Sequence, residues 1–133
     1  MSTLARVPLD IALRSIALLV LAEGVAAIYS DSQPDDDGLG AGLTVMFLLL
    51  CAAAIWGLVD GFRRSSGRLC LIWSLTGVGV SVGLTLYSNL RYGDFSWTVL
   101  LSDLSTGLFF WAGLVALPAI GLGIVVTMTR ERR

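Results

Sequence analysis

The 133-residue chain has no histidine and no lysine, and its nine basic residues are all arginine. Without an imidazole, it has no histidine to act as a general base, a haem ligand or a zinc ligand. The two cysteines, Cys51 and Cys70, do not form a CxxC motif, and we expect both to be free thiols that pack as small apolar side chains. We therefore expect a protein that is not an enzyme and that holds no cofactor and no metal.

Charge is also scarce, because only 14% of the residues are charged while 56% are hydrophobic, and the mean hydropathy is +0.82. Soluble domains are about a quarter charged and less than half apolar, since they must cover their surface with polar groups. A chain that faces lipid needs no such coat. The composition therefore indicates an integral membrane protein, and the length indicates a single domain over 1–133.

Four apolar runs, approximately 9–29, 39–59, 69–87 and 107–128, are long enough to cross a membrane. A helix needs about 20 residues to cross a hydrocarbon core about 30 Å thick. Because the backbone in lipid must satisfy its own hydrogen bonds, we predict four transmembrane helices in an all-α, up-down bundle. The first run is longer than the apolar region of a signal peptide and is interrupted by Glu23, so we expect it to remain as a spanning helix.

The arginines are distributed unequally between the two sides of this predicted topology. Only Arg91 lies on the side of the first and third loops. The other eight lie on the side of the termini and the middle loop: Arg6, Arg14, Arg63, Arg64, Arg68, Arg130, Arg132 and Arg133. The positive-inside rule then places both termini in the cytoplasm. We expect a multi-pass protein of the bacterial cytoplasmic membrane.

The segment 95–105, before the fourth run, is amphipathic. Its apolar residues lie on one helical face, and its polar residues lie off that face. The apolar set, continued to 108, is Trp97, Leu100, Leu101, Leu104 and Leu108, and the polar set is Thr98, Ser102, Asp103 and Ser105. The segment is either a short helix in the outer interface or the outer turns of one long fourth helix. We favour the interfacial helix.

Glu23 interrupts an otherwise apolar run, "LVLAEGVAAIY". On a helical wheel it shares a face with small residues such as Ala22 and Ala26, while bulky residues occupy the opposite face. Small residues let helices approach closely, so we predict that Glu23 points into the bundle. Arg14 lies on the far side from Glu23 near the cytoplasmic end, where we expect its side chain to extend toward the lipid headgroups.

Glu23, Ser81 and Asp103 are each six residues from an outer aromatic residue, and Thr44 lies somewhat nearer the surface. If the fourth helix is continuous, these residues form a candidate polar layer inside the bundle. Two carboxyl groups there would share a proton, which would suit a small oligomeric transporter or channel. Alternatively, Glu23 donates a structural hydrogen bond to Ser81 or to a backbone carbonyl, or it contacts another membrane subunit.

Small residues spaced four apart recur in the helices, notably at Gly77, Gly79, Ser81 and Gly83, and also at Gly57, Gly61, Ala119 and Gly123. We interpret them as helix-packing positions within the chain. Because catalytic motifs are absent, the leading hypothesis is an accessory, structural or assembly component. Its expected partners are the lipid bilayer and another membrane protein or a second copy, and not nucleic acid. The alternative is the transporter with Glu23 as its protonatable site, joined by Asp103 in a shared layer.

Overall fold

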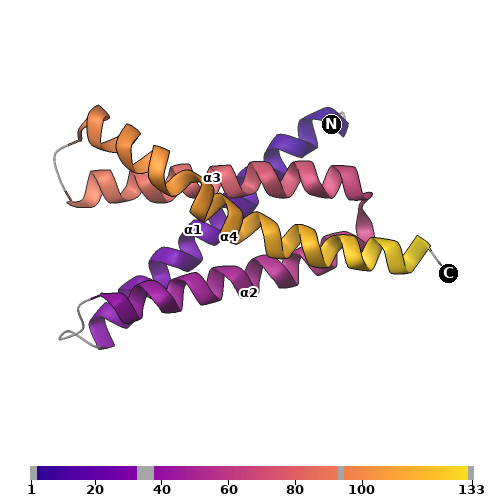
Figure 1. Cartoon of the computed structure of the whole chain (residues 1–133), viewed down its shortest axis with the longest axis horizontal. Helices are drawn as coiled ribbons and strands as arrows, with labels where there is room; N and C mark the ends of the chain where they lie inside the picture. The colour runs from indigo at the N-terminus through magenta and orange to yellow at the C-terminus, as the bar shows by residue number, and fades with distance from the viewer. Residues whose placement is uncertain (1–2, 33–37, 93–94, 132–133) are drawn as a thin grey trace.

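The computed structural model describes residues 3–32, 38–92 and 95–131, and these residues form four helices. They are α1 (Thr3–Ser32), α2 (Leu39–Arg63), α3 (Ser66–Tyr92) and α4 (Trp97–Glu131). Each is long and apolar enough to cross a membrane, so the chain is a small multi-pass membrane protein. The N-terminus, the α2–α3 connection and the C-terminus lie at one end of the bundle, as an up-down topology requires (Figure 1). The predicted four-helix fold is confirmed.

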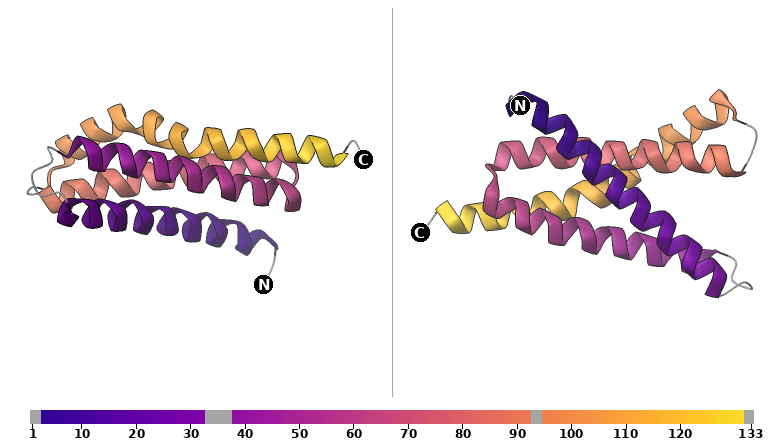
Figure 2. Two further views of the ribbon diagram at one scale, coloured as in Figure 1. Left: turned by 90° about the horizontal axis from the view of Figure 1, so that it is seen from below. Right: turned by 180° about the vertical axis from the view of Figure 1, so that it is seen from behind.

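The helices form three layers (Figure 2). The middle layer holds α2 and α3, which diverge from their short connection and meet each other at few residues. One face of this layer is covered by α4, which packs extensively on both, and the other by α1. Among the described residues, α1 and α4 do not touch each other.

Packing against α4 depends on residues without a side chain. A Cβ atom added to Gly57 of α2 would overlap the backbone of Ala119, and one added to Gly61 would overlap the backbone of Gly123. On α3, a Cβ atom at Gly77 would lie 2.6 Å from the carbonyl oxygen of Ala112. The helix backbones of α2, α3 and α4 are therefore in direct contact, as small residues in membrane helices allow.

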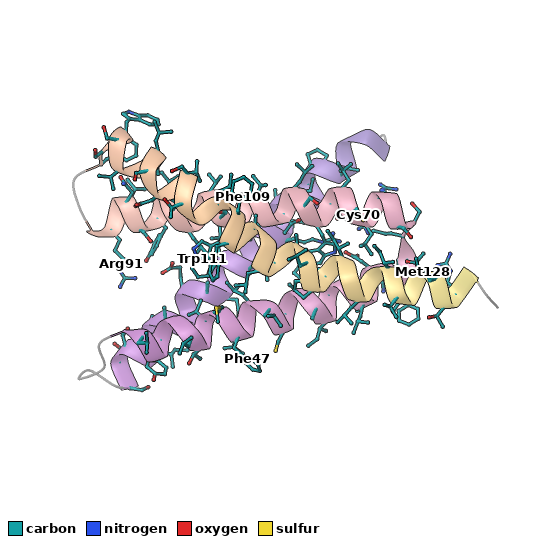
Figure 3. The ribbon with its side chains drawn as sticks, in the orientation of Figure 1. Phe47, Cys70, Arg91, Phe109, Trp111 and Met128 are labelled. Atoms are coloured by element: carbon teal, nitrogen blue, oxygen red, sulfur yellow. The ribbon has the colours of Figure 1, made fainter. Side chains whose placement is uncertain are left out.

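The apolar core is narrow, and much of the apolar surface faces outward. Among the core residues, Leu49 of α2, Trp73 of α3 and Val115 of α4 are fully buried. Conversely, Phe47 is 63% exposed and Phe109 is 83% exposed, and both point away from the bundle (Figure 3). Large exposed apolar side chains are expected where the surrounding solvent is lipid. Cys51 and Cys70 are free, as predicted.

The expected interfacial helix at 95–105 is wrong, because α4 is one helix from Trp97 to Glu131. Leu100, Leu104 and Leu108 are half-buried, whereas Ser102 and Asp103 are exposed. Trp97 and Leu101 of the expected apolar face are exposed as well, at 68% and 61%, so that face is buried only in part, and it belongs to the first turns of a 35-residue helix. No proline or left-handed residue interrupts this part of α4, and the helix also continues through Pro118.

Candidate functional site

The most buried charged residues in the described structure are Asp60 and Arg14, and they belong to a cluster around Asp60, in the last turn of α2. The carboxylate of Asp60 accepts hydrogen bonds from the indole Nε1 of Trp73 at 2.9 Å, from Nη2 of Arg14 at 3.1 Å and from Nε of Arg64 at 3.2 Å. Nη1 of Arg14 also lies 3.0 Å from the second carboxylate oxygen. One side chain therefore connects α1, α2 and α3.

Arg64 reaches Asp60 because α2 ends beside it. Its backbone is extended (φ −128°, ψ 158°), and its N–H donates to the carbonyl of Asp60. The side chain then turns back along α2, and its Nη2 donates to Asp10 of α1 at 2.7 Å. Burial disfavours the charge of Arg64, but the hydrogen bond to Asp10 and the charges of Asp60 and Asp10 outweigh it, so its pKa is raised. Arg64 is thus a permanent cation between two helices.

Arg14 is 5% exposed, so the expectation that it extends to the lipid headgroups is wrong. Its guanidinium lies over two indole rings, 5.5 Å from the centroid of Trp56 and 5.5 Å from that of Trp73. The two rings pack edge to face with centroids 6.2 Å apart. The helical wheel of α1 did not reveal this environment, because the carboxylate and the rings belong to other helices.

This cluster can hold helices together, and its charges are paired with one another, although Nη1 of Arg14 makes no hydrogen bond. Asp10, Arg14, Asp60 and Arg64 sum to zero charge, and Asp60 uses its lone pairs on three donors. Ion pairs reinforced by hydrogen bonds and cation–π contacts keep charged groups stable where water is excluded. No group of three or more potential metal ligands exists among the described residues. We therefore describe the arrangement as an ionic clamp, meaning Asp10, Arg14, Asp60, Arg64, Trp56 and Trp73.

Glu23 lies in the half of the bundle away from the ionic clamp, between α1 and α3. Its Oε2 is 3.6 Å from Nη1 of Arg91, which also donates to the hydroxyl of Tyr87 at 3.0 Å. Figure 3 shows Arg91 extending from α3 toward the side of the bundle that holds α1 and α2. The side chains of Glu23 and Arg91 are 31% and 48% exposed, so this ion pair is accessible, unlike the clamp.

The candidate polar layer of Glu23, Ser81, Asp103 and Thr44 does not come together. Ser81 is buried one turn from Gly77, whose backbone faces α4, and so lies off the α1-facing side of α3. Its hydroxyl has no hydrogen-bond partner among the described residues. The Thr44 hydroxyl donates to the Gly40 carbonyl in its own helix at 2.8 Å, and Asp103 is exposed on α4. Residues that we expected at the same depth in the bundle therefore lie on different sides of it.

The positions singled out for packing lie where helices meet. Added Cβ atoms at Gly79 and Gly83 would overlap Ser15 and Leu19 of α1, so these two glycines face α1 rather than α4. Ala22 is 2% exposed in the core, and Ala26 packs partly buried against that core. The small residues therefore do serve packing within the chain, as the sequence indicated.

The topology arginines Arg63, Arg68 and Arg130 are exposed at the end of the bundle that holds the ionic clamp. Arg130 donates to the carbonyl of Phe62 at 2.6 Å, and so connects α4 to α2 there. Arg132 and Arg133 lie outside the described residues.

Comparison with protein-family models, curated proteins and solved structures finds no match to this chain. Function is therefore inferred from the geometry of the chain itself.

Proposed function

We propose that this chain is a non-catalytic accessory or assembly component that binds another membrane protein and acts as a rigid partner rather than as a conduit. The pairing of its interior charged side chains with one another supports the proposal. Inside the bundle, the charged groups of the ionic clamp pair with one another, although Nη1 of Arg14 lies 3.0 Å from Asp60 without a hydrogen bond, and Glu23 is paired with Arg91. Chemistry on a substrate needs a group that is free to react, and these groups are committed to holding helices.

The observation that carries the proposal is the polar surface on the first turns of α4. Ser102, Asp103, Ser105 and Thr106 are all exposed on a helix that is otherwise apolar enough to cross a membrane. With 35 residues at 1.5 Å each, α4 is about 52 Å long, which exceeds the ~40–45 Å of a bilayer with its headgroups. We infer that these turns reach the membrane surface, where the carboxylate of Asp103 can accept hydrogen bonds from a partner, while the hydroxyls of Ser105 and Thr106 donate to the carbonyl of Ser102 in their own helix.

The test is to place a photo-crosslinking amino acid at position 103 in the full chain, in the cells that produce it. We expect one membrane protein to be crosslinked, and to co-purify with the unmodified chain in mild detergent at a fixed ratio. Asp103→Leu should reduce this co-purification at least about tenfold. The reason is that a partner's polar group left buried without its hydrogen bond costs more than ~1.4 kcal/mol of binding free energy.

The matched control is the same crosslinker at position 117, since Leu117 is 73% exposed on the same helix but is apolar. Crosslinks to the same protein from both positions would indicate random collision in the membrane. A chain that purifies alone in every mild detergent, with no crosslink from position 103, would overturn the proposal.

A further inference from the structure

A groove runs between α1 and α3 in the half of the bundle that contains Glu23. Its apolar part has a volume of about 330 Å³ and is lined mainly by Leu19, Val20, Leu86 and Leu90, with Gly83 at its floor. It exists because α1 crosses α3 obliquely, so that the two helices separate away from the crossing (Figure 2). The groove opens sideways, toward the space that lipid occupies around a spanning protein.

A second, polar cavity of about 140 Å³ continues from this groove toward the ends of the helices. Glu23 and Tyr87 line both, so the two spaces adjoin. The polar cavity adds Ser30, Ser88 and Arg91, together with Ala26 and Ala27. Along α1 the apolar residues Leu19 and Val20 come before Ser30. Along α3 Leu86 comes before Ser88 and Arg91, although Leu90 lies between those two, so the lining becomes more polar toward the ends of the helices.

We propose that this groove binds one zwitterionic phospholipid of the bilayer, with an ammonium and a phosphate in its headgroup. An acyl chain would lie along the apolar part, the ammonium beside Glu23 and the phosphate beside Arg91. The apolar groove leads into the polar cavity as the tail of a lipid leads into its headgroup, and the 3.6 Å between Glu23 and Arg91 places the two charges side by side for the ammonium and the phosphate. Because Glu23 and Arg91 are 3.6 Å apart and partly exposed, each can bind the headgroup while their own ion pair is kept.

Charge complementarity selects this class of lipid. An anionic headgroup without an ammonium would be attracted by Arg91 but repelled by Glu23, whereas a zwitterionic headgroup satisfies both. Lipid tails gain little from leaving other lipid tails, so preference among lipids must come from the headgroup. The site is distinct from the proposed partner surface, since the residues that line it belong to α1 and α3 and none belongs to α4.

The experiment uses the full chain in nanodiscs made from equal amounts of phosphatidylethanolamine and phosphatidylglycerol. Native mass spectrometry after release into mild detergent counts the lipids that the protein retains. We expect one retained lipid, with phosphatidylethanolamine preferred roughly fivefold, the discrimination that one partly exposed ion pair supplies. Glu23→Gln should remove this preference, and Arg91→Gln should reduce retention of both lipids.

A third variant distinguishes a blocked site from a damaged fold. Leu90→Trp fills the apolar groove without changing a charge and should reduce lipid retention, while Leu117→Trp adds the same bulk to an exposed position on α4 and should not. Circular dichroism checks that each variant is folded. Equal retention of the two lipids by the unmodified chain, or an unchanged preference in folded Glu23→Gln protein, would overturn the proposal. Neither result would affect crosslinking from position 103.

Discussion

At the scale of single residues, the carboxylate of Asp60 differs from every other described carboxylate in its surroundings. Its side chain is 5% exposed and accepts hydrogen bonds from three side chains, whereas that of Asp10 is 36% exposed and contacts Arg64. A buried charge that loses its counter-charge is left without solvation, so truncating one member of a buried pair is costly. The cost should therefore follow burial and not the number of formal charges.

We predict that Asp60→Asn lowers the free energy of unfolding by about 3 kcal/mol, because it leaves Arg14 buried without a counter-charge. Asp10→Asn should cost less than about 1 kcal/mol, since its ion pair is partly exposed. Unfolding by sodium dodecyl sulfate in mixed micelles, followed by tryptophan fluorescence, measures both. Fluorescence is suitable because Trp73 donates directly to Asp60.

The double variant Arg14→Met with Asp60→Leu provides the control. It removes both buried charges of the pair and should be less destabilised than Asp60→Asn alone, because no unpaired charge remains at that position. If Asp60→Asn and Asp10→Asn lowered the free energy of unfolding equally, the buried ion pair of the ionic clamp would not contribute more to stability than the partly exposed one.

The sequence allowed Glu23 to be assigned to a packed face, because small residues surround it on the helical wheel. It did not show that Arg91 is the partner, although Arg91 stands out as the one arginine on its side of the predicted topology. Asp60 likewise lies just beyond the predicted second apolar run, 39–59, and nothing in its sequence neighbourhood indicates its partners on other helices. A helical wheel describes the faces of a single helix, whereas ion pairs between helices depend on how those helices cross.

At the scale of the helices, α2 and α4 meet through two pairs of residues one turn apart. Gly57 faces Ala119, and Gly61 faces Gly123. The hydroxyl of Thr127 adds hydrogen bonds to the carbonyls of Gly61, at 3.2 Å, and Gly123, at 2.9 Å. The spacing of these small residues was visible in the sequence, but the identity of the opposing helix was not, since each small face could pack on any neighbour.

We predict that Gly57→Ala destabilises the protein by about 1–3 kcal/mol, because the added methyl group would overlap the backbone of Ala119 and separate α2 from α4. Gly121→Ala is the matched control, because a Cβ atom there meets nothing within 4 Å. Since alanine favours helix more than glycine does, this control should be neutral or slightly stabilising. Both are measured by the same detergent unfolding, and equal effects of the two substitutions would contradict the close approach of the backbones.

The start of α4 shows what hydrophobic periodicity does not determine. Leu100, Leu104 and Leu108 of the predicted apolar face are half-buried, whereas Trp97 and Leu101 are exposed. The choice between a separate helix and a continuous one depends on whether the chain breaks after 105. Glycine has a low helix propensity, so Gly107 is the residue at which a break would be expected. It nevertheless lies inside α4, and it does not have a positive φ angle. Periodicity indicates which face is buried and does not indicate where a helix ends.

At the scale of the whole molecule, the two charged clusters lie in opposite halves of the bundle, and the core between them is mostly apolar but also buries Ser15, Thr76 and Ser81. The layer between the ionic clamp and the Glu23–Arg91 pair includes Leu18, Ala22, Leu49, Val80 and Val115, all of which are buried. Apolar side chains packed at the density of protein interiors leave little room for a chain of water molecules. Charge at both ends with a largely apolar middle, in which the buried hydroxyls of Thr76 and Ser81 have no hydrogen-bond partner among the described residues, favours a protein that holds its shape over one that conducts ions.

The predicted consequence concerns proton flux, the property on which the transporter hypothesis depends. The purified chain, reconstituted into vesicles containing a pH-sensitive dye, should dissipate a pH gradient no faster than protein-free vesicles. Glu23→Gln should leave that rate unchanged, because Glu23 is paired with Arg91 at the outer end of the apolar core and is not in a shared layer with the exposed Asp103. A proton channel of known rate in parallel vesicles controls for intact gradients. Flux well above the protein-free rate that Glu23→Gln abolishes would contradict the closed core and restore Glu23 as a protonation site.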